Sequence, residues 1–264
     1  MSRILAEVFS FLADKLGLKV IPQWRWNHYE LANHTKDLFD LIKIDCVLDV
    51  GANKGQYANF LRTHVGYKGL ILSFEPVSDM YKQLNENSIN DHLWKAFPFA
   101  FGASNGICTI NITKGHTLNS FLKPKKSGLT FGGEYSVDDY NEAIRSEDVE
   151  VKTIDSFLEE MDLGFDLKKA KIFLKIDAQG FESYILDGAK KSLSMIHALQ
   201  SEVSCLPIYQ DMVEYLTAIQ NLKNLGFDVT GMIPVNRDQW LRVVEFDFIA
   251  INREKIKEIT PSRF

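Results

Sequence analysis

Acidic residues stand at or near the ends of several short apolar runs in this sequence. Asp49 lies in the first run, Glu75 directly follows the second, and Asp177 closes a later one. If these runs are parallel strands, their carboxyl ends meet at one edge of a sheet, where open α/β sheets bind ligands. Glu182 and Glu202 follow in the next expected helix and strand. The sequence therefore predicts carboxylates gathered around one cleft.

The turn after the first run has the pattern D-x-G-x-x-x-G, from Asp49 to Gly55. Gly51 permits a tight backbone turn, and Gly55 lets the following helix begin close to a ligand. A nicotinamide dinucleotide favours G-x-G-x-x-G, and Asn53 stands where that pattern needs its second glycine. A ligand with an ammonium and a carboxylate but no phosphate fits better, since Asp49 can hold a cation and backbone N–H groups an anion. S-adenosylmethionine is such a ligand.

Glu75 supports the same ligand. An acid at the end of the second strand can accept hydrogen bonds from both ribose hydroxyls of an adenosyl group. Pro76 then ends the strand and begins the next helix. Two carboxylates associated with two successive strands are stronger support than one turn alone.

The elements that position these residues follow from the hydrophobic pattern. From Asp45 onward, short β-rich runs alternate with helical patterns, which is typical of βαβ units and a mostly parallel sheet. The expected strands are 46–50, 70–74, 94–101, 172–177, 197–203, 227–233 and 245–251. The expected helices are 56–64, 77–87, 182–193 and 208–225. Because no helical pattern joins the last two strands, we predict an α/β fold: a doubly wound, seven-stranded sheet with an antiparallel final hairpin.

The region between the third and fourth of these strands has a different composition. Residues 108–113 alternate with period two, as an extra antiparallel strand would. Residues 114–150 are rich in Gly, Ser, Lys and Asp and show no sustained period. Loops of this length are often lids or binding loops, and disorder is an alternative of equal weight. A short helix is then expected, with its N-cap at Asp155-Ser156 and its end near Met161.

Residues 1–44 are predicted to form a helical extension before an α/β domain of residues 45–264. Apolar residues recur there at helical spacing: Ile4, Leu5, Val8, Phe9, Leu12 and Leu16. A helix packed on the protein or on a second copy of the chain is favoured over one on a membrane surface, because its polar face carries acids. No segment has the roughly 20 apolar residues of a transmembrane helix or the pattern of a secretory signal.

Composition argues against several other classes of protein. The 264 residues carry 30 Lys and Arg against 35 Asp and Glu, a net charge of −5, so we expect no nucleic-acid partner. Cys46, Cys108 and Cys205 are far apart and lack CxxC spacing. They argue against a disulfide framework or a cysteine zinc site and favour the cytoplasm. The histidines form no cluster with metal-ligand spacing, so no metal is expected.

Taken together, these residues resemble the FkbM-type methyltransferases, a branch of the class I S-adenosylmethionine-dependent fold. The resemblance covers roughly residues 45–252 and rests on these segments: Val47 to Tyr57, Phe74 to Pro76, Val151 to Asp155, Leu174 to Glu182 and Ile185 to Ala189. It implies transfer of the cofactor's methyl group to an oxygen, in that family usually a hydroxyl of a sugar, glycan or polyketide-like product.

Carried over by position, the resemblance also implies a cofactor site. Its residues would be Asp49, Gly51, Ala52, Asn53, Gly55, Tyr57, Glu75, Pro76, Ala100, Phe101 and Asp177. Glu75 would hold the ribose, Ala100 and Phe101 would border the adenine, and Asp177 would face the sulfonium and the acceptor. Acceptor specificity is expected in the N-terminal extension and in residues 114–150.

A hydroxyl acceptor must also lose its proton, and a positioned base typically adds about 10²- to 10⁴-fold in rate. The candidates are Asp177 first, then Glu182 and Glu202, with His116 fourth. Two other functions stay open at this point: an NAD-dependent oxidoreductase, and a non-catalytic protein that binds S-adenosylmethionine. The expected partner is a small-molecule or glycan acceptor. A second copy of the chain and the inner membrane face, reached through the N-terminal helix, are left open as further partners.

Overall fold

The computed structural model describes residues 28–259 except 133, 162–166 and 168, together with 13, 15–18, 20–21 and 23–26. The helix predicted from Ile4 to Leu16 falls mainly outside this range and stays a prediction. Within the described part of residues 1–44, the chain forms α2 (Gln23–Trp26) and α3 (Tyr29–Ile42). None of the helices in the described ranges is long and apolar enough to cross a membrane.

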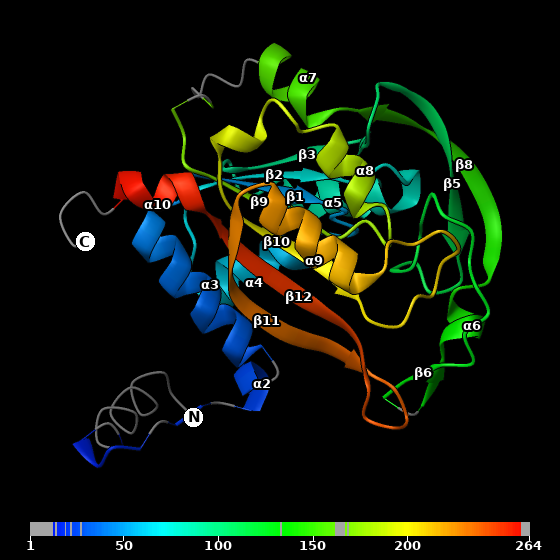
Figure 1. The fold of residues 1–264 in the computed structure, drawn as a ribbon, viewed down its shortest axis with the longest axis horizontal. Helices are drawn as coiled ribbons and strands as arrows, with labels where there is room; N and C mark the ends of the chain where they lie inside the picture. Colours follow the sequence, from blue (N-terminus) through cyan, green and yellow to red (C-terminus); the bar gives the residue numbers. More distant parts are fainter. Residues whose placement is uncertain are drawn as a thin grey trace.

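The predicted seven-stranded sheet is confirmed (Figure 1). Its strands lie in this order: β3 (Trp94–Phe97), β2 (Leu70–Phe74), β1 (Cys46–Val50), β9 (Ile172–Ile176), β10 (Ile196–Ser204), β12 (Val243–Asn252) and β11 (Phe227–Arg237). The first five run parallel, and β12 is antiparallel to both β10 and β11, so the final hairpin is also confirmed. Since strand order reverses beside β1, the carboxyl ends of β1 and β9 form the crevice in which such sheets bind ligands.

Helices cover both faces of this sheet. Cys46, Leu48 and Val50 pack with α7 (Ile154–Glu160), α8 (Glu182–Asp187) and α9 (Tyr215–Asn224). On the other face Val47 packs with α3, α4 (Gln56–Phe60) and α5 (Ser78–Ser88). A π-helical turn (Leu61–Val65) completes the helix predicted over 56–64, and α10 (Arg253–Ile259) ends the described chain. This arrangement explains the continuous apolar character of the parallel strands.

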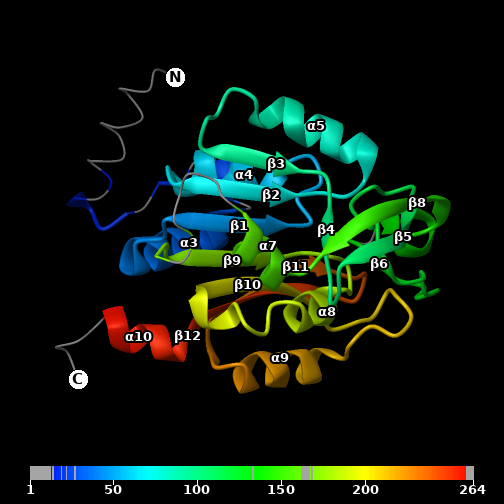
Figure 2. The same cartoon turned by 90° about the horizontal axis from the view of Figure 1, so that it is seen from above.

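The predicted third strand is divided in two. Pro98 cannot donate a backbone hydrogen bond, and β3 ends at Phe97. Ala100 and Phe101 form β4, which belongs to a separate three-stranded sheet with β8 (Ala143–Lys152) and β5 (Gly106–Thr113). Figure 2 shows this small sheet beyond the carboxyl ends of β1, β2 and β3. It forms one wall beside the crevice.

The excursion predicted over 114–150 is shorter than expected and contains regular structure. Its last eight residues belong to β8, which pairs antiparallel with β5 and thereby confirms the extra strand predicted at 108–113. Most side chains of β8 are exposed, so its sequence lacks a visible apolar alternation. The excursion also contains β6 (Thr130–Phe131), β7 (Tyr135–Ser136) and α6 (Val137–Tyr140).

Three helix boundaries also differ from the predictions. The helix expected over 182–193 ends at Asp187 with Gly188 as its C-cap, and a 3₁₀ turn (Leu193–Met195) follows separately. Gly188 passes close to Gly102, since a Cβ there would lie 2.0 Å from the Gly102 carbonyl oxygen. The helix expected over 208–225 begins only at Tyr215, because Tyr209 forms a β-bridge with Pro124 instead. The N-cap of α7 is the residue before Ile154, Thr153, whose hydroxyl accepts the Ser156 N–H.

Candidate active site

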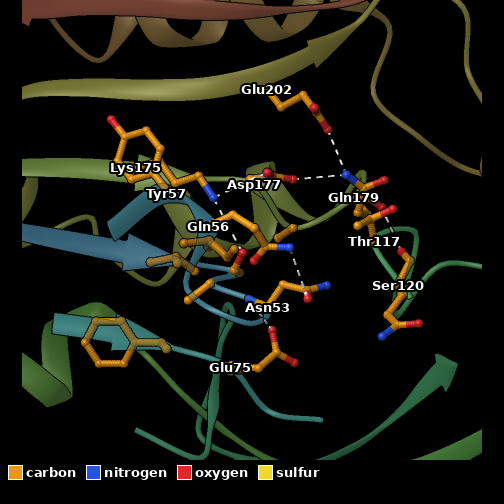
Figure 3. Close-up of a pocket in the computed structure, with 18 of the residues that line it drawn as sticks. Asn53, Gln56, Tyr57, Glu75, Thr117, Ser120, Lys175, Asp177, Gln179 and Glu202 are labelled. Atoms are coloured by element: carbon orange, nitrogen blue, oxygen red, sulfur yellow. Dashed lines mark hydrogen bonds and ion pairs between the residues drawn. The ribbon is translucent and has the colours of Figure 1, made fainter. Parts of the chain in front are cut away.

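A cavity of about 410 Å³ opens at the carboxyl ends of β1, β2, β9 and β10. Its volume lies within the range of small-ligand sites, roughly 300–1,000 Å³. The turns after β1 and β2 form one half, which we call the cofactor half. The turn after β9 and residues of β10 and β12 form the other, which we call the acceptor half. Figure 3 shows the polar side chains of both halves around one space.

Gly51 is the point where the two halves touch. Its φ is 74°, and a Cβ at this position would lie 1.8 Å from the carbonyl oxygen of Asp177. Only glycine lets the turn after β1 pass so close to the end of β9. Gly55 has a different neighbour, since a Cβ there would lie 2.5 Å from the Trp94 ring, and Gly55 does not line the cavity.

Several backbone N–H groups in the turn after β1 donate hydrogen bonds to other parts of the protein. Gly51 and Ala52 donate to the carbonyl oxygen of Phe74, and Asn53 donates to Glu75. The expectation that these N–H groups hold the anionic part of a ligand therefore does not fit. The Asn53 side chain, at a φ of 48°, lines the cavity with Gln56 and donates 3.0 Å to the carbonyl oxygen of His116.

Glu75 projects into the cofactor half directly after β2. Each of its carboxylate oxygens accepts one backbone N–H at 2.9 Å, from Asn53 and from Val77. Burial raises the pKa of Glu75 to about 7, although these two hydrogen bonds oppose the shift. Hydroxyl donors from a ligand would favour the ionised form further, so this carboxylate suits a diol such as ribose.

The remaining wall of the cofactor half is mostly apolar. It contains Phe74, Pro76, Ala100, Phe101, Ile110 and Ile185. Phe101 is fully buried, and its ring lies 4.5 Å from the Phe74 ring between centroids. Aromatic and aliphatic side chains of this kind form the usual wall around a flat heterocycle. The cofactor half thus offers an apolar slot beside a carboxylate.

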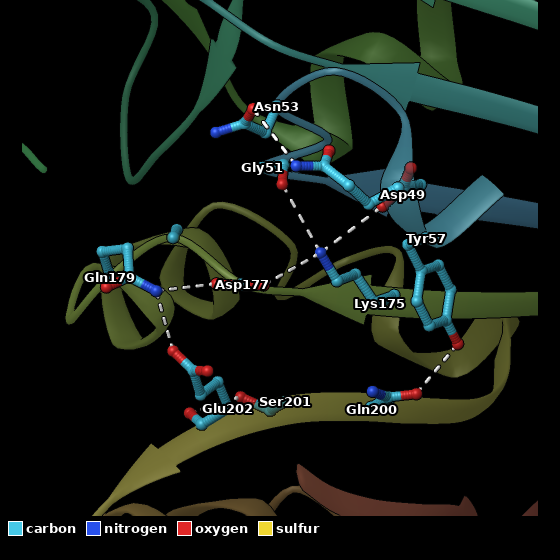
Figure 4. A network of polar contacts seen from close by, with 12 residues as sticks. Asp49, Gly51, Asn53, Tyr57, Lys175, Asp177, Gln179, Gln200, Ser201 and Glu202 are labelled. Carbon is cyan, nitrogen blue, oxygen red and sulfur yellow. Dashed lines mark hydrogen bonds and ion pairs between the residues drawn. The ribbon is translucent and has the colours of Figure 1, made fainter. Parts of the chain in front are cut away.

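Asp49 lies under the cavity and does not line it. It occupies the strand β1, facing α4, in register with Ser73 on β2 and Lys175 on β9. The Ser73 hydroxyl donates a hydrogen bond of 2.9 Å to one carboxylate oxygen of Asp49, and the Lys175 ammonium lies 3.5 Å from the other. Figure 4 shows the Lys175 ammonium beside Asp49. Asp49 therefore holds a protein cation.

Lys175 connects this row to the acceptor half. Its ammonium lies 3.3 Å from the Asp177 carboxylate and 3.5 Å from the carbonyl oxygen of Gly51, and it also lies over the Tyr57 ring. Burial acts to lower the pKa of Lys175, but the charges of Asp177 and Asp49 outweigh it and raise that pKa above its ordinary value. Lys175 is therefore charged and orients Asp177, whose side chain remains 36% exposed.

Two carboxylates of the acceptor half, Asp177 and Glu202, are bridged by one amide. Gln179 donates 3.0 Å to Asp177 and 2.9 Å to Glu202 (Figure 4). Burial raises the pKa of Glu202 well above its ordinary value, and the nearby charges of Glu245 and Asp177 raise it further. The structure thus brings together one carboxylate beside a lysine and one in a low-dielectric, acidic setting.

Glu182 is turned away from this cavity. One of its oxygens accepts the backbone N–H groups of Ala178 at 3.0 Å and of Gly180 at 3.2 Å. It lines a second cavity between α8 and α9 and does not line the first. Burial raises its pKa to about 7. In this position Glu182 stabilises the turn that carries Gln179.

The segment 116–121 covers the cavity and contacts both halves. Asn53 binds the backbone of His116 in the cofactor half, and the Ser120 hydroxyl donates 2.7 Å to the carbonyl oxygen of Gln179 in the acceptor half. The residues of this segment that line the cavity are His116, Thr117, Asn119, Ser120 and Phe121. This part of the predicted excursion lies over the binding site.

Most of the residues predicted for the site line one cavity: Gly51, Ala52, Asn53, Tyr57, Glu75, Pro76, Ala100, Phe101, Asp177 and Glu202. Asp49, Gly55 and Glu182 do not. The lining residues that were not predicted as site residues include Gln179, Gln200 and Asp247. Gln200 accepts 2.8 Å from the Tyr57 hydroxyl, and Asp247 pairs in register with Glu202. The two-residue spacing of Gln200 and Glu202 on one strand was the signal available for one of them.

No group of three or more His, Cys, Asp or Glu side chains in the described ranges is arranged to hold a metal ion. The arrangement can instead bind a ligand that combines an apolar ring, a diol and a reacting centre near two carboxylates. Lys175 is the only lysine or arginine among the described lining residues, and it is already paired with Asp49 and Asp177.

Comparison with known proteins gives one family. The model of the methyltransferase FkbM domain matches residues 49–229, which contain the turn after β1, Glu75 and the acceptor-half strands β9 and β10. No curated protein matches the chain.

Solved structures share the general fold at low identity. An FkbM methyltransferase from Methylobacillus flagellatus KT is 13% identical with a TM-score of 0.47; the match covers 78% of this chain but 43% of that one. An S-adenosylmethionine-dependent methyltransferase from Aquifex aeolicus is 14% identical with a TM-score of 0.41, covering 88% and 94%. Aeropyrum pernix fibrillarin with bound S-adenosylmethionine is 9% identical, TM-score 0.42, covering 78% and 66%. Scores this low do not assign an activity.

Proposed function

The chain belongs to the FkbM methyltransferase family, whose cofactor is S-adenosylmethionine, and we propose that it methylates a hydroxyl oxygen of a sugar, glycan or polyketide-like acceptor. The single observation that carries the proposal is one cavity with two chemically different halves. The cofactor half combines an apolar slot with the buried carboxylate of Glu75, and the acceptor half contains Asp177 and Glu202.

The residues of the cofactor half fit the proposed cofactor. Glu75 would accept the ribose hydroxyls with the lone pairs left by its two backbone hydrogen bonds. Phe101 and Ala100 would border the adenine, and the side chains of Asn53 and Gln56 would contact the amino acid part. When bound, the cofactor supplies a methyl group on a sulfonium, which is an electrophile that needs no metal.

The acceptor half has two tasks in this proposal, to orient a hydroxyl and to take its proton. Holding reactants in line contributes up to about 7 to 11 kcal/mol in well-oriented pairs. Asp177 is held by Lys175 and Gln179, so its carboxylate is suited to orienting the acceptor. Glu202 is suited to taking the proton, because its raised pKa makes its ionised form a stronger base than an ordinary carboxylate.

The test of the proposed cofactor is calorimetric titration of the protein with S-adenosylmethionine, S-adenosylhomocysteine and NAD. We expect both adenosyl ligands to bind and NAD not to bind. Glu75→Gln should weaken adenosyl binding by about 10- to 100-fold. A glutamine has only one oxygen for two backbone N–H donors, and its amide NH₂ group would face the other donor. The matched control is Glu86→Gln on the exposed side of α5.

Binding of NAD in place of the adenosyl ligands would contradict the proposal. The variant Asp49→Ala is less informative, because it leaves the Lys175 ammonium buried beside one fewer carboxylate. After cofactor binding is established, transfer of a labelled methyl group should be screened over neutral glycosides, oligosaccharides and polyketide-like alcohols. Transfer to none of them would contradict the proposed acceptor class and leave the cofactor assignment intact.

We also propose a reducing, cytoplasmic setting for this enzyme. All three cysteines are free, which supports that setting. Contact with the inner membrane face through the predicted N-terminal helix, and association with a second copy, stay predictions because they depend on residues 4–12.

A further inference from the structure

Gln179 occupies an unusual backbone position between the two carboxylates of the acceptor half. It follows β9 in the turn before α8, and its φ is 52°, in the left-handed region that residues other than Gly and Asn rarely adopt. In this conformation its side chain lies between Asp177 and Glu202, which come from two different strands (Figures 3 and 4). Backbone strain beside a ligand cavity indicates that the position of the side chain matters for function.

The hydrogen bonds determine how the Gln179 amide is oriented. The Gln179 NH₂ group faces Asp177 and Glu202 and donates one N–H to each. This orientation suits the ionised form of both carboxylates, which can only accept. The amide oxygen then lies 3.0 Å from the hydroxyl of Tyr209, which is 2.9 Å from the carbonyl oxygen of Leu118 as well. Tyr209 is buried, with 1% of its surface exposed, so this hydroxyl has these two protein acceptors around it.

We propose that Gln179 is a positioning residue that separates and orients the carboxylates of Asp177 and Glu202, and that Tyr209 fixes the direction of the Gln179 amide. Two carboxylates that meet in one site repel each other and share a proton. An amide between them gives each carboxylate its own donor. The catalytic meaning of this arrangement rests on the proposed function, because it leaves one carboxylate to orient the acceptor and the other to take its proton.

Other charged groups around Glu202 act on it too. Glu245 and Asp247 face it from β12, Asp177 from the end of β9 and Glu182 from α8, and the Lys175 ammonium is the nearby cation. The acids all disfavour the ionised form of Glu202. The N–H donated by Gln179 is the one side-chain hydrogen bond that this carboxylate receives in the described structure. Removing that donor should therefore have a visible effect on the titration of Glu202.

The experiment is carboxyl-carbon NMR of protein labelled in glutamate, followed from pH 4 to 10, with the Glu202 signal assigned by its loss in Glu202→Gln. In Gln179→Met, which keeps the length of the side chain, we expect the Glu202 midpoint to rise by about one pH unit, the effect of losing one hydrogen bond to a charged group. In Tyr209→Phe the Glu202 midpoint should rise by less. The Gln179 amide remains in this variant, but without the Tyr209 hydroxyl it can flip and turn its oxygen toward Glu202.

Matched controls separate this effect from general damage. Gln220→Met on the exposed side of α9 and Tyr135→Phe on exposed β7 should leave the Glu202 midpoint unchanged. Gln179→Asn keeps an amide and tolerates the left-handed backbone, but its shorter side chain cannot reach both carboxylates. It should titrate like Gln179→Met, and it provides the test if Gln179→Met does not fold.

An unchanged Glu202 midpoint in folded Gln179→Met or Gln179→Asn would overturn the role of Gln179. An unchanged midpoint in folded Tyr209→Phe would overturn the role of Tyr209. The titration uses the protein without any ligand, so it does not depend on the proposed cofactor or acceptor. Calorimetry of the wild-type protein with S-adenosylhomocysteine reports separately on the proposed function.

Discussion

The cofactor half and the acceptor half of the cavity are built in different ways. The cofactor half comes mainly from two turns that follow neighbouring strands, and its key contact joins Asn53 to Glu75 over a short stretch of chain. The acceptor half also joins residues farther apart in the sequence, such as Ser120 with Gln179 and Glu202 with Asp247. The first half depends on local backbone geometry, and the second depends on the assembled sheet.

The difference also appears in how each half uses its polar groups. In the cofactor half, backbone N–H groups satisfy Glu75. In the acceptor half, side chains satisfy one another: Lys175 pairs with Asp177, and Gln179 bridges Asp177 to Glu202. Side-chain substitutions in this chain can therefore alter the acceptor half while the backbone contacts of the cofactor half remain. Substitutions that affect one half, both or neither test this division.

The largest effect is expected from Gly51→Ala, because Gly51 is where the halves touch. An alanine Cβ would lie 1.8 Å from the Asp177 carbonyl oxygen, so the turn and β9 would have to separate. We expect a loss of about 4 kcal/mol or more in the free energy of unfolding, together with loss of adenosyl binding. Urea unfolding and calorimetry measure both.

Gly66→Ala is the matched control for this prediction. Gly66 also has a positive φ, 78°, but no atom lies within 4 Å of its missing Cβ. It should lose only the strain of the left-handed backbone, about 1 kcal/mol. Equal losses in the two variants would mean that backbone strain alone explains Gly51 and that the halves do not depend on its close contact.

A smaller and more selective effect is expected from Glu202→Gln. Transfer to the acceptor should fall by about 10²- to 10⁴-fold, the usual contribution of a positioned base, while adenosyl affinity stays within about 3-fold. In the wild type, transfer should rise with pH as Glu202 loses its proton, and this rise should be absent in the variant. Single-turnover transfer and calorimetry distinguish the two quantities. If Glu202→Gln lowered adenosyl affinity as much as methyl transfer, Glu202 would belong to both halves, and the two halves would not be independent.

The same division separates what the sequence predicts from what it does not. The strands that carry the site, the turn from Gly51 to Asn53 and the acid Glu75 were all predicted, because each is a local pattern of apolar residues ending in a glycine or an acid. Asp49 was expected in the cavity, but it lies one residue before the end of β1 and faces α4. The sequence does contain a signal for this position, because successive side chains of a strand point to opposite faces and Asp49 therefore faces away from the side that Val50 occupies.

The acceptor half could be predicted only in part. Asp177 and Glu202 follow from strand ends, but the contact between them needs Gln179 in a left-handed conformation, which no local pattern indicates. Tyr209 was expected in a helix, because its apolar neighbours have helical spacing. In the structure the pairing with Pro124 takes it into a β-bridge. Asp247 enters the cavity through the register of β12 with β10, which a single sequence does not fix.

The smallest effect on binding is expected from Glu182→Gln, and its measurement decides whether Glu182 belongs to either half. One oxygen of Glu182 accepts both backbone hydrogen bonds of the turn, so a glutamine can keep them. Burial raises the pKa of Glu182 from its usual 4.5 to about 7 in the folded protein. Its contribution to stability is therefore complete below pH 4.5 and is lost as pH rises to 7, an effect on the order of 3 kcal/mol.

Glutamine does not titrate, so the variant and the wild type should be equally stable below pH 4.5, and the variant should be more stable above pH 7. Urea unfolding across this range measures the difference, and exposed Glu86→Gln should follow the wild type. Adenosyl binding and methyl transfer should both persist in Glu182→Gln, since Glu182 does not line the cavity. Loss of transfer with unchanged stability would instead make Glu182 part of the acceptor half. The turn that presents Gln179 would then itself carry a reacting group, and the acceptor half would extend to the second cavity beside α9.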